Sequence, residues 1–157
     1  MGSNKKFFFN LDEENYYDRK EHTFLLPFTE DQKEAVNYAV NHELNPEVIA
    51  YTHISANNMW KMLKHIQNNR SKATYSPVKV WKIGQTDLSE DAFDSCLDAL
   101  SHDISMVDEI ENIYQYSDDI LYLVSVAASY NINICNKIYP GISENTVLDI
   151  VQTIQSQ

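Results

Sequence analysis

Apolar residues along this chain recur at helical spacing in five successive segments. Each segment opens with an apolar residue, then Ser or Thr, then polar or acidic residues. A hydroxyl at that position caps a free N–H group of a helix, and the preceding apolar residue packs on the first turn. The pattern therefore predicts five helix starts, at Phe28-Thr29, Ile54-Ser55, Leu88-Ser89, Tyr116-Ser117 and Ile142-Ser143.

The interiors of the five segments also agree with one another. If the opening apolar residue is place zero, places 5, 8, 9 and 12 are mostly apolar, which is the pattern of one helix face. The starts are 26, 34, 28 and 26 residues apart. One such segment cannot bury its apolar face alone, so neighbouring segments must stack. We expect a repeated unit, each a helix of about 13 residues followed by a short return segment.

This pattern resembles short helical repeats found in proteins of Firmicutes and their mobile elements. The stretches "FTEDQKEAVNYAVNHELNPEVIAYTH" and "ISANNMWKMLKHI" carry the resemblance, which covers roughly half of the chain. Those repeats often have Gly just before place 16, and this chain does not. The resemblance implies stacked short helices and no particular activity.

Three other segments are short and rich in aromatic or β-branched residues, as strands are, at 5–11, 22–28 and 77–84. With only 3 Gly and 4 Pro, most of the chain is expected to be helical. The predicted fold is mainly α with a small N-terminal antiparallel sheet, an α+β arrangement in a single domain. Its parts are a β element (1–27 plus 77–84), helical repeats (28–66 and 88–157) and a flexible loop (67–77).

The net charge of −11 is concentrated in the second half of the chain. Residues 1–82 hold 10 acids and 11 bases, whereas residues 83–157 hold 13 acids and one base. In the third segment, four Asp recur at i, i+4, i+7 and i+11 and form a stripe roughly opposite the apolar one. The candidate partner-binding residues are Asp87, Glu90, Asp91, Asp94, Asp98, Asp103, Asp108, Glu109, Asp118 and Asp119.

Two interpretations of these acids remain open, a solvated helix face and a surface that binds a basic partner. Rows of carboxylates can replace DNA phosphates and engage Arg and Lys side chains that normally hold nucleic acid. In composition the chain resembles small acidic phage proteins that inhibit CRISPR or restriction nucleases. The leading hypothesis is a phage or mobile-element inhibitor that blocks such a nuclease in the bacterial cytoplasm. One alternative is an immunity protein that neutralises a basic toxin, and another is a nucleic-acid-binding accessory protein that acts through Lys61 to Lys82.

A second candidate patch combines basic and aromatic residues between positions 60 and 82. Such a patch could contact nucleic acid, although the net charge of the chain argues against direct binding. The two Trp could instead pack inside the fold, or the bases could pair with the acidic helix, within one molecule or in a homodimer. The residues of this patch are Trp60, Lys61, Lys64, Arg70, Lys79, Trp81 and Lys82.

The sequence offers little that could perform catalysis or hold a cofactor. Its glycines are isolated, its histidines are not spaced at i, i+4, and nothing marks a nucleophile elbow. Asp118-Asp119 and Glu13-Glu14 could hold a metal, but solvated acids at helix starts explain them better. Cys96 and Cys135 are expected to be buried thiols. No apolar run approaches 18 residues, so no membrane span is expected. We expect a non-enzymatic protein without metal or cofactor.

Overall fold

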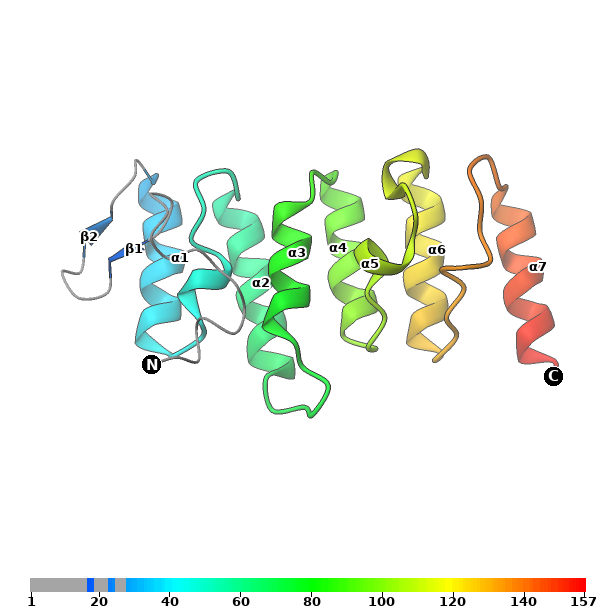
Figure 1. Cartoon of the computed structure of the whole chain (residues 1–157), viewed down its shortest axis with the longest axis horizontal. Coiled ribbons are helices and arrows are strands. Elements are labelled where there is room, and N and C mark those ends of the chain that lie inside the picture. Colours follow the sequence, from blue (N-terminus) through cyan, green and yellow to red (C-terminus); the bar gives the residue numbers. More distant parts are fainter. Residues whose placement is uncertain (1–16, 19–22, 25–27) are drawn as a thin grey trace. The chain divides into compact units, whose positions relative to one another are not determined.

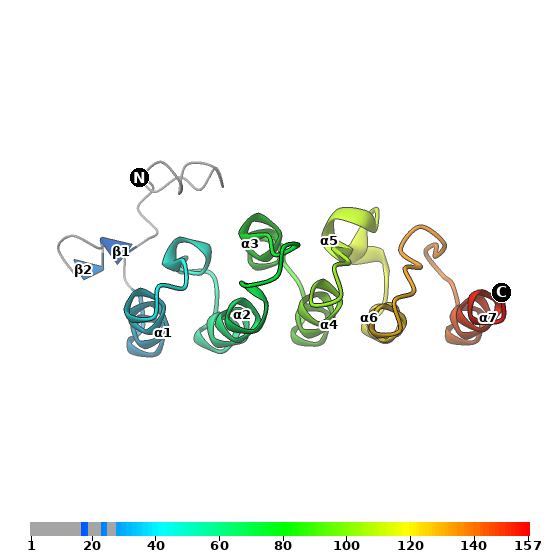
Figure 2. The same ribbon diagram turned by 90° about the horizontal axis from the view of Figure 1, so that it is seen from below.

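The computed structural model describes residues 17–18, 23–24 and 28–157. The chain divides into two compact units, Met1–Gln85 (unit 1) and Thr86–Gln157 (unit 2). Each unit is built from main helices that lie side by side and shorter return segments that form a second layer (Figures 1 and 2). Each unit therefore alternates main helices with return segments.

Unit 1 has two main helices, α1 and α2, with helix α3 in the return layer (Figure 2). A short 3-10 helix, η2, connects α1 to the segment that leads into α2. At the N-terminal side, β1 and β2 form an antiparallel pair in which Tyr17 is opposite Phe24. The bounds are β1 Tyr17–Asp18, β2 Thr23–Phe24, α1 Glu30–Asn41, η2 Pro46–Val48, α2 Ala56–Asn69 and α3 Pro77–Gln85.

Unit 2 has three main helices, α4, α6 and α7, and α6 packs against both of the others. The return layer consists of the short helices α5 and η3 between α4 and α6, and an irregular segment between α6 and α7 (Figures 1 and 2). The bounds are α4 Glu90–Leu100, α5 Met106–Glu109, η3 Ile113–Gln115, α6 Asp118–Ser129 and α7 Glu144–Gln155.

All five helix N-caps predicted from the sequence are confirmed. In each main helix the side-chain oxygen of the cap accepts a hydrogen bond from the backbone N–H three residues later. Thr29 forms a full capping box, because the Gln32 side chain also accepts from the backbone N–H of Thr29. The caps are Thr29, Ser55, Ser89, Ser117 and Ser143.

The aligned apolar places form the cores of α2, α4 and α6. Place 5 is Met59, Phe93 and Leu121, and all three side chains are buried. In α1 the same place is Lys33, which is only half-buried, and the small buried residues Ala35 and Ala39 complete the apolar face of that helix. Helix α7 buries only Val147. Burial is therefore deeper in α2, α4 and α6 than in α7.

Three main helices end in the same backbone motif, just before place 16, where similar repeats often have Gly. Glu43, Asp103 and Asn131 each have φ between 56° and 67°, the left-handed conformation. In each case the next residue donates its N–H to a carbonyl five residues back, for example Ile104 to Ala99 at 3.1 Å. This is the Schellman ending, which Gly adopts most easily. The chain keeps the geometry of a Gly ending with other residues.

The predicted N-terminal sheet, and with it the α+β class, is wrong. The described part of the chain is helical, and β1 and β2 have only two residues each, too few for a layer that covers the helices. The predicted strand at 5–11 lies outside the described residues. The segment 77–84, which alternates apolar and basic residues, belongs to helix α3.

Helix α3 forms because its buried positions follow helical and not strand spacing. Pro77, Val80, Ile83 and Gly84 are buried, which is the i, i+3, i+6, i+7 pattern of a helix face. Pro at the first helical position favours a helix start, and the hydroxyl of Ser76 accepts from the N–H of Lys79 at 3.3 Å. Gly84 lets the helix approach α2 closely, since a Cβ there would lie 2.9 Å from the Met62 Cε atom.

Candidate protein-binding surface

Helix α4 presents the stripe of carboxylates that the sequence singled out. Phe93, Cys96 and Leu97 are buried beneath the helix, so the opposite positions face solvent. Those positions are places 3, 6 and 10, which we call the outward places, and in α4 they are Asp91, Asp94 and Asp98, all exposed. No Lys, Arg or His occurs in the sequences of α4, α6 or α7. Within these three helices no basic side chain offsets the carboxylates of the stripe.

Helix α6 extends the negative face and adds an aromatic side chain. Its outward places are Asp119, Tyr122 and Val126, and Tyr122 is 59% exposed. The starts of the two helices are joined, because the Ser89 hydroxyl donates a 2.7 Å hydrogen bond to the Asp118 carboxylate. We define the acidic surface as Asp91, Asp94 and Asp98 of α4 together with Asp119 and Tyr122 of α6.

Crowding of carboxylates on α4 affects the titration of one of them. The pKa of Asp98 is raised above its ordinary value by partial burial, and further by the neighbouring Asp94 carboxylate, while His102 opposes the shift. A raised pKa means that the negative charge is costly in the folded state. The charge on Asp98 therefore does not stabilise the folded state.

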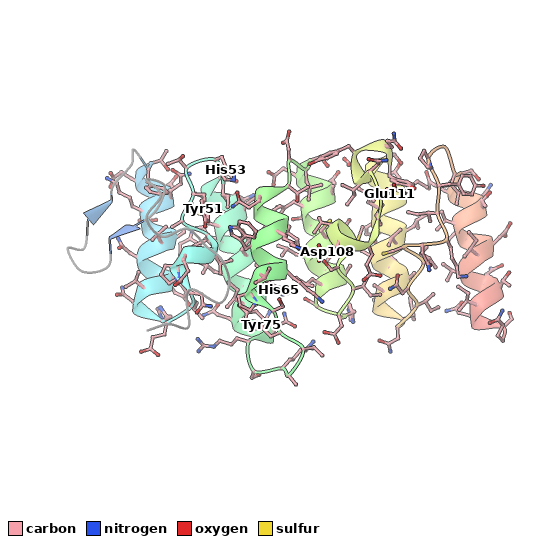
Figure 3. All side chains as sticks on the ribbon, viewed as in Figure 1. Tyr51, His53, His65, Tyr75, Asp108 and Glu111 are labelled. Atoms are coloured by element: carbon pink, nitrogen blue, oxygen red, sulfur yellow. The ribbon has the colours of Figure 1, made fainter. Side chains whose placement is uncertain are left out.

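The other predicted acids do not all belong to this surface. Asp87 and Glu90 lie exposed at the start of α4, and Asp103 forms the left-handed turn after its end. Asp108 lies on α5 in the return layer (Figure 3), where it accepts a 2.8 Å hydrogen bond from the Ser105 hydroxyl. Glu109 accepts from the side-chain amide of Asn133 at 2.8 Å. Asp108 and Glu109 thus help to hold the return segments.

The seven basic and aromatic candidates are distributed over two helices and two layers of unit 1. Trp60, Lys61 and Lys64 lie on α2, and Lys79, Trp81 and Lys82 on α3. The indole N–H of Trp81 donates to the hydroxyl of Tyr51 at 3.2 Å. Arg70, at the end of α2, donates to the carbonyl of Glu43 at 3.2 Å.

Trp60 belongs to an exposed aromatic group that the sequence prediction missed. Its ring meets Tyr38 of α1 edge-on, with centroids 5.2 Å apart, and Tyr38 stacks on His42 at 3.9 Å. The Tyr38 hydroxyl accepts a 2.8 Å hydrogen bond from the Gln67 side chain. We call Tyr38, His42 and Trp60 the aromatic platform. The sequence did contain a signal for it, because Trp60 and Tyr38 are at outward places 6 and 10.

Unit 2 also exposes apolar side chains that were not predicted as site residues. Leu148 of α7 is 47% exposed and, like Trp60 and Tyr122, is at place 6 of its repeat. Tyr114, Tyr130 and Tyr139 are more than half exposed. Exposed tyrosine side chains are enriched at protein-binding surfaces.

Two buried polar groups of unit 1 have pKa values far from their ordinary ones. His65 is buried, which lowers its pKa to about 4, and its ring shares a 3.3 Å hydrogen bond with the Asn69 amide. Burial raises the pKa of Tyr75 to about 12. His65 and Tyr75 lie at the same end of unit 1, away from Tyr51 and His53 (Figure 3).

The thiols and the pocket of unit 2 offer no assembled catalytic group within the described residues. Burial raises the pKa of both Cys96 and Cys135 to about 12, so neither is a ready nucleophile. An open pocket of about 500 Å³ lies at the starts of α6 and α7 and is lined by Ser117, Ile120, Ile142, Ser143, Glu144 and Asn145. The hydroxyls of its two serines already cap their helices.

Neither a metal site nor a membrane span occurs within the part of the chain that the structure describes. There, no three His, Cys, Asp or Glu side chains are grouped so that they could hold a metal ion. None of the described helices is both long and apolar enough to cross a membrane. Comparison with models of protein families, with curated proteins and with solved structures finds no match.

Proposed function

We propose that this chain is a non-enzymatic inhibitor that binds a protein partner through the acidic surface. The observation that carries the proposal is the exposed row Asp91, Asp94 and Asp98 on one helix. Like charges four residues apart cost a few tenths of a kcal/mol per pair in a helix. The pKa of Asp98 is raised by burial and by Asp94, in agreement with that cost. A row that opposes folding is best explained by a use in binding.

The chemistry of this surface fits a partner that normally binds nucleic acid. Phosphates follow one another along a strand, and Lys and Arg side chains of nucleases are placed to meet them. Carboxylates on successive turns of α4 offer a similar row of negative charge, and Tyr122 adds an aromatic ring of the kind that dominates interface energies. We propose a host defence nuclease, such as a CRISPR effector, as the partner, and a phage or mobile element as the origin.

The same surface also suits an immunity protein that neutralises a basic toxin. Both functions use carboxylates against a basic site, and the identity of the captured partner distinguishes them. A toxin encoded beside this chain would favour the immunity function, and a host nuclease would favour the inhibitor. Under either proposal the protein acts in the bacterial cytoplasm.

Affinity capture from bacterial lysate tests the proposal. The bait is the full chain, and the comparison is the variant Asp91→Asn, Asp94→Asn, Asp98→Asn. The matched control changes three exposed acids elsewhere in unit 2, with Glu111→Gln, Glu144→Gln and Asp149→Asn. We expect the partner to be lost with the first variant, kept with the control, and weakened as salt rises. Equal capture by all three baits would refute the proposal.

A second measurement addresses the mimicry of nucleic acid. Once the partner is identified, its binding to labelled DNA or RNA is measured while the inhibitor is added. Competition by the unmodified chain and by the control variant, and none by the Asp-to-Asn variant, is the expected outcome. A partner that holds the inhibitor and its nucleic acid together would exclude mimicry.

A further inference from the structure

Helix α7 is the least buried main helix of unit 2. Places 5, 8, 9 and 12 are all buried in α4, and the same four places are buried in α6. In α7 only Val147, at place 5, is buried. The residues at its other three places, Ile150, Val151 and Ile154, are half-exposed although all three are apolar. The sequence of α7 therefore follows the repeat, whereas its packing is incomplete.

The starts of α6 and α7 are not joined as the starts of α4 and α6 are. Between α4 and α6, the Ser89 hydroxyl at place 1 donates to the Asp118 carboxylate at place 2, at 2.7 Å. The equivalent residues of the next pair are Ser117 and Glu144, and in the described part of the chain no hydrogen bond joins them. Both instead line the open pocket of about 500 Å³. The α6–α7 contact is therefore open at the end where the α4–α6 contact is closed.

Helix α7 also depends on a contact along one of its sides. Ile120 of α6 lines the pocket together with residues of α7, so the side of α6 formed by places 4, 7 and 11 faces α7. In α4 and α6 these places bury mostly small or apolar side chains. In α7 they are Thr146, Asp149 and Thr153, and the last two are exposed. Because this side of α7 is polar, it offers no apolar face to a further helix, and α7 relies on its contact with α6.

The segment that leads into α7 ends in a glycine with few contacts. Gly141 has a φ of 90°, and a Cβ built there would meet no atom within 4 Å. The buried residues of the segment, Ile134 and Cys135, lie near its start, whereas residues 136–141 are exposed or half-exposed. Hinges are a few loop residues that absorb a change in backbone angles. Little packing opposes such a change at Gly141.

We infer that α7 undocks from α6 as one cooperative unit, about Gly141, while α4 and α6 stay folded. Local opening occurs where few apolar side chains are buried, and Val147 is the one fully buried side chain of α7. An isolated helix of 12 residues is at best marginally stable in water, so the undocked segment loses its helix and regains it on α6.

Undocking changes the surface of α6, the helix that carries Tyr122 of the acidic surface. Ile120 and Ala127 are buried and Leu123 is half-buried while α7 is docked. These apolar side chains become accessible when α7 opens. An apolar face beside the acidic surface then exists only in the open state, and the docking equilibrium of α7 controls how much surface a partner buries. This consequence rests on the proposed function, whereas the undocking itself does not.

Hydrogen exchange measured by NMR for each amide of the full chain tests the inference without a partner. The variant Val147→Ala removes apolar contact at the one buried place of α7. Separate opening predicts that this variant accelerates exchange throughout α7 by at least about tenfold and leaves α4 and α6 unchanged. If α7 opens only when the whole of unit 2 unfolds, the variant will accelerate α4, α6 and α7 by the same factor. That outcome would overturn the inference.

Two further measurements separate undocking from other motions. Leu148→Ala changes an exposed residue of the same helix and should leave the exchange rates of α7 within about twofold of the unmodified chain. Low concentrations of urea should accelerate α4 and α6 more than α7, since the opening of one helix exposes less surface than the unfolding of the unit. Fraying from the C-terminal end of α7 would leave the amides of residues 147–151 as protected as those of α6, and this pattern would also overturn the inference.

Discussion

Helices α2 and α4 are the clearest comparison within this molecule. Each starts at a Ser cap, and each buries the residues at places 5, 8, 9 and 12. Their outward places differ completely, with Asn57, Trp60 and Lys64 on α2 against three Asp on α4. The caps and the buried places determine the helix, and the outward places are free to vary. Functional residues are therefore best sought at the outward places, where the two units differ.

The largest expected effect comes from breaking the core of one unit. Leu121 of α6 is 2% exposed, and Leu121→Ala should destabilise unit 2 by about 2–5 kcal/mol through lost burial and a cavity. Hydrogen exchange followed by mass spectrometry should show faster exchange in peptides from 86–157. Peptides from 28–85 should keep their rates, because each unit has its own core. Equal acceleration in both would show that the units unfold together.

Leu148→Ala on α7 is the control for that measurement. Leu148 is 47% exposed and occupies an outward place, so its removal should change stability by less than about 0.5 kcal/mol. Both variants replace Leu with Ala, so the difference between their stabilities reports the difference between a buried place and an outward place.

The distinction between the places that determine the helix and the outward places also explains which features of the structure the sequence predicts. The N-caps were predictable because a hydroxyl before a helical apolar pattern has one common structural role. Helix α3 was not, because over eight residues the alternation of apolar and basic residues hides the helical set Pro77, Val80 and Ile83. The left-handed turns at Glu43 and Asp103 carry no Gly and gave no signal.

The candidate surface was predictable in its charge but not in its extent. The exposed stripe on α4 followed directly from the spacing of its Asp residues. Tyr122 and Tyr38 were overlooked because single aromatic residues in a helix are usually part of a core. Which of the scattered acids share a face depends on how neighbouring helices pack. The sequence alone does not give that packing.

Lowering the pH should destabilise unit 1 through the buried side chain of His65, and unit 2 has no buried histidine. His65 has a pKa of about 4 in the folded chain, below its ordinary 6.5, because burial and Lys72 disfavour the charged form. Between these values the unfolded chain binds a proton that the folded chain does not. Stability therefore falls as pH decreases from 6.5 towards 4, by about 2–3 kcal/mol.

Fluorescence isolates this effect, because both Trp residues, Trp60 and Trp81, belong to unit 1. Urea unfolding followed by Trp emission should give a steeper pH dependence for the unmodified chain than for His65→Gln. Identical pH profiles for the two chains would mean that His65 binds protons equally in the folded and unfolded states, which would contradict the prediction.

The left-handed helix ends are expected to give a smaller effect that is the same in both units. Glu43→Gly and Asp103→Gly should each stabilise the fold by about 0.5–1 kcal/mol, since Gly adopts this backbone without steric cost. Glu34→Gly, in the middle of α1, is the opposite control and should destabilise by about 1 kcal/mol. Thermal unfolding measures all three. A loss of stability at both helix ends would contradict the Schellman assignment.

The smallest expected effect bears most directly on the acidic surface. Asp98→Asn removes a charge whose pKa is raised by burial and by Asp94, so at neutral pH it should stabilise unit 2 by a few tenths of a kcal/mol. A carboxyl with a raised folded pKa binds more protons folded than unfolded, so its cost is full above the folded pKa and vanishes below the unfolded one. The gain in stability from Asp98→Asn should therefore disappear as pH falls below about 4.

Unfolding followed by circular dichroism at several pH values measures this gain. A gain that persists in acid would assign the effect to packing. If the variant gains stability at neutral pH while capture of the partner decreases, the stripe lowers the stability of the fold and serves binding instead.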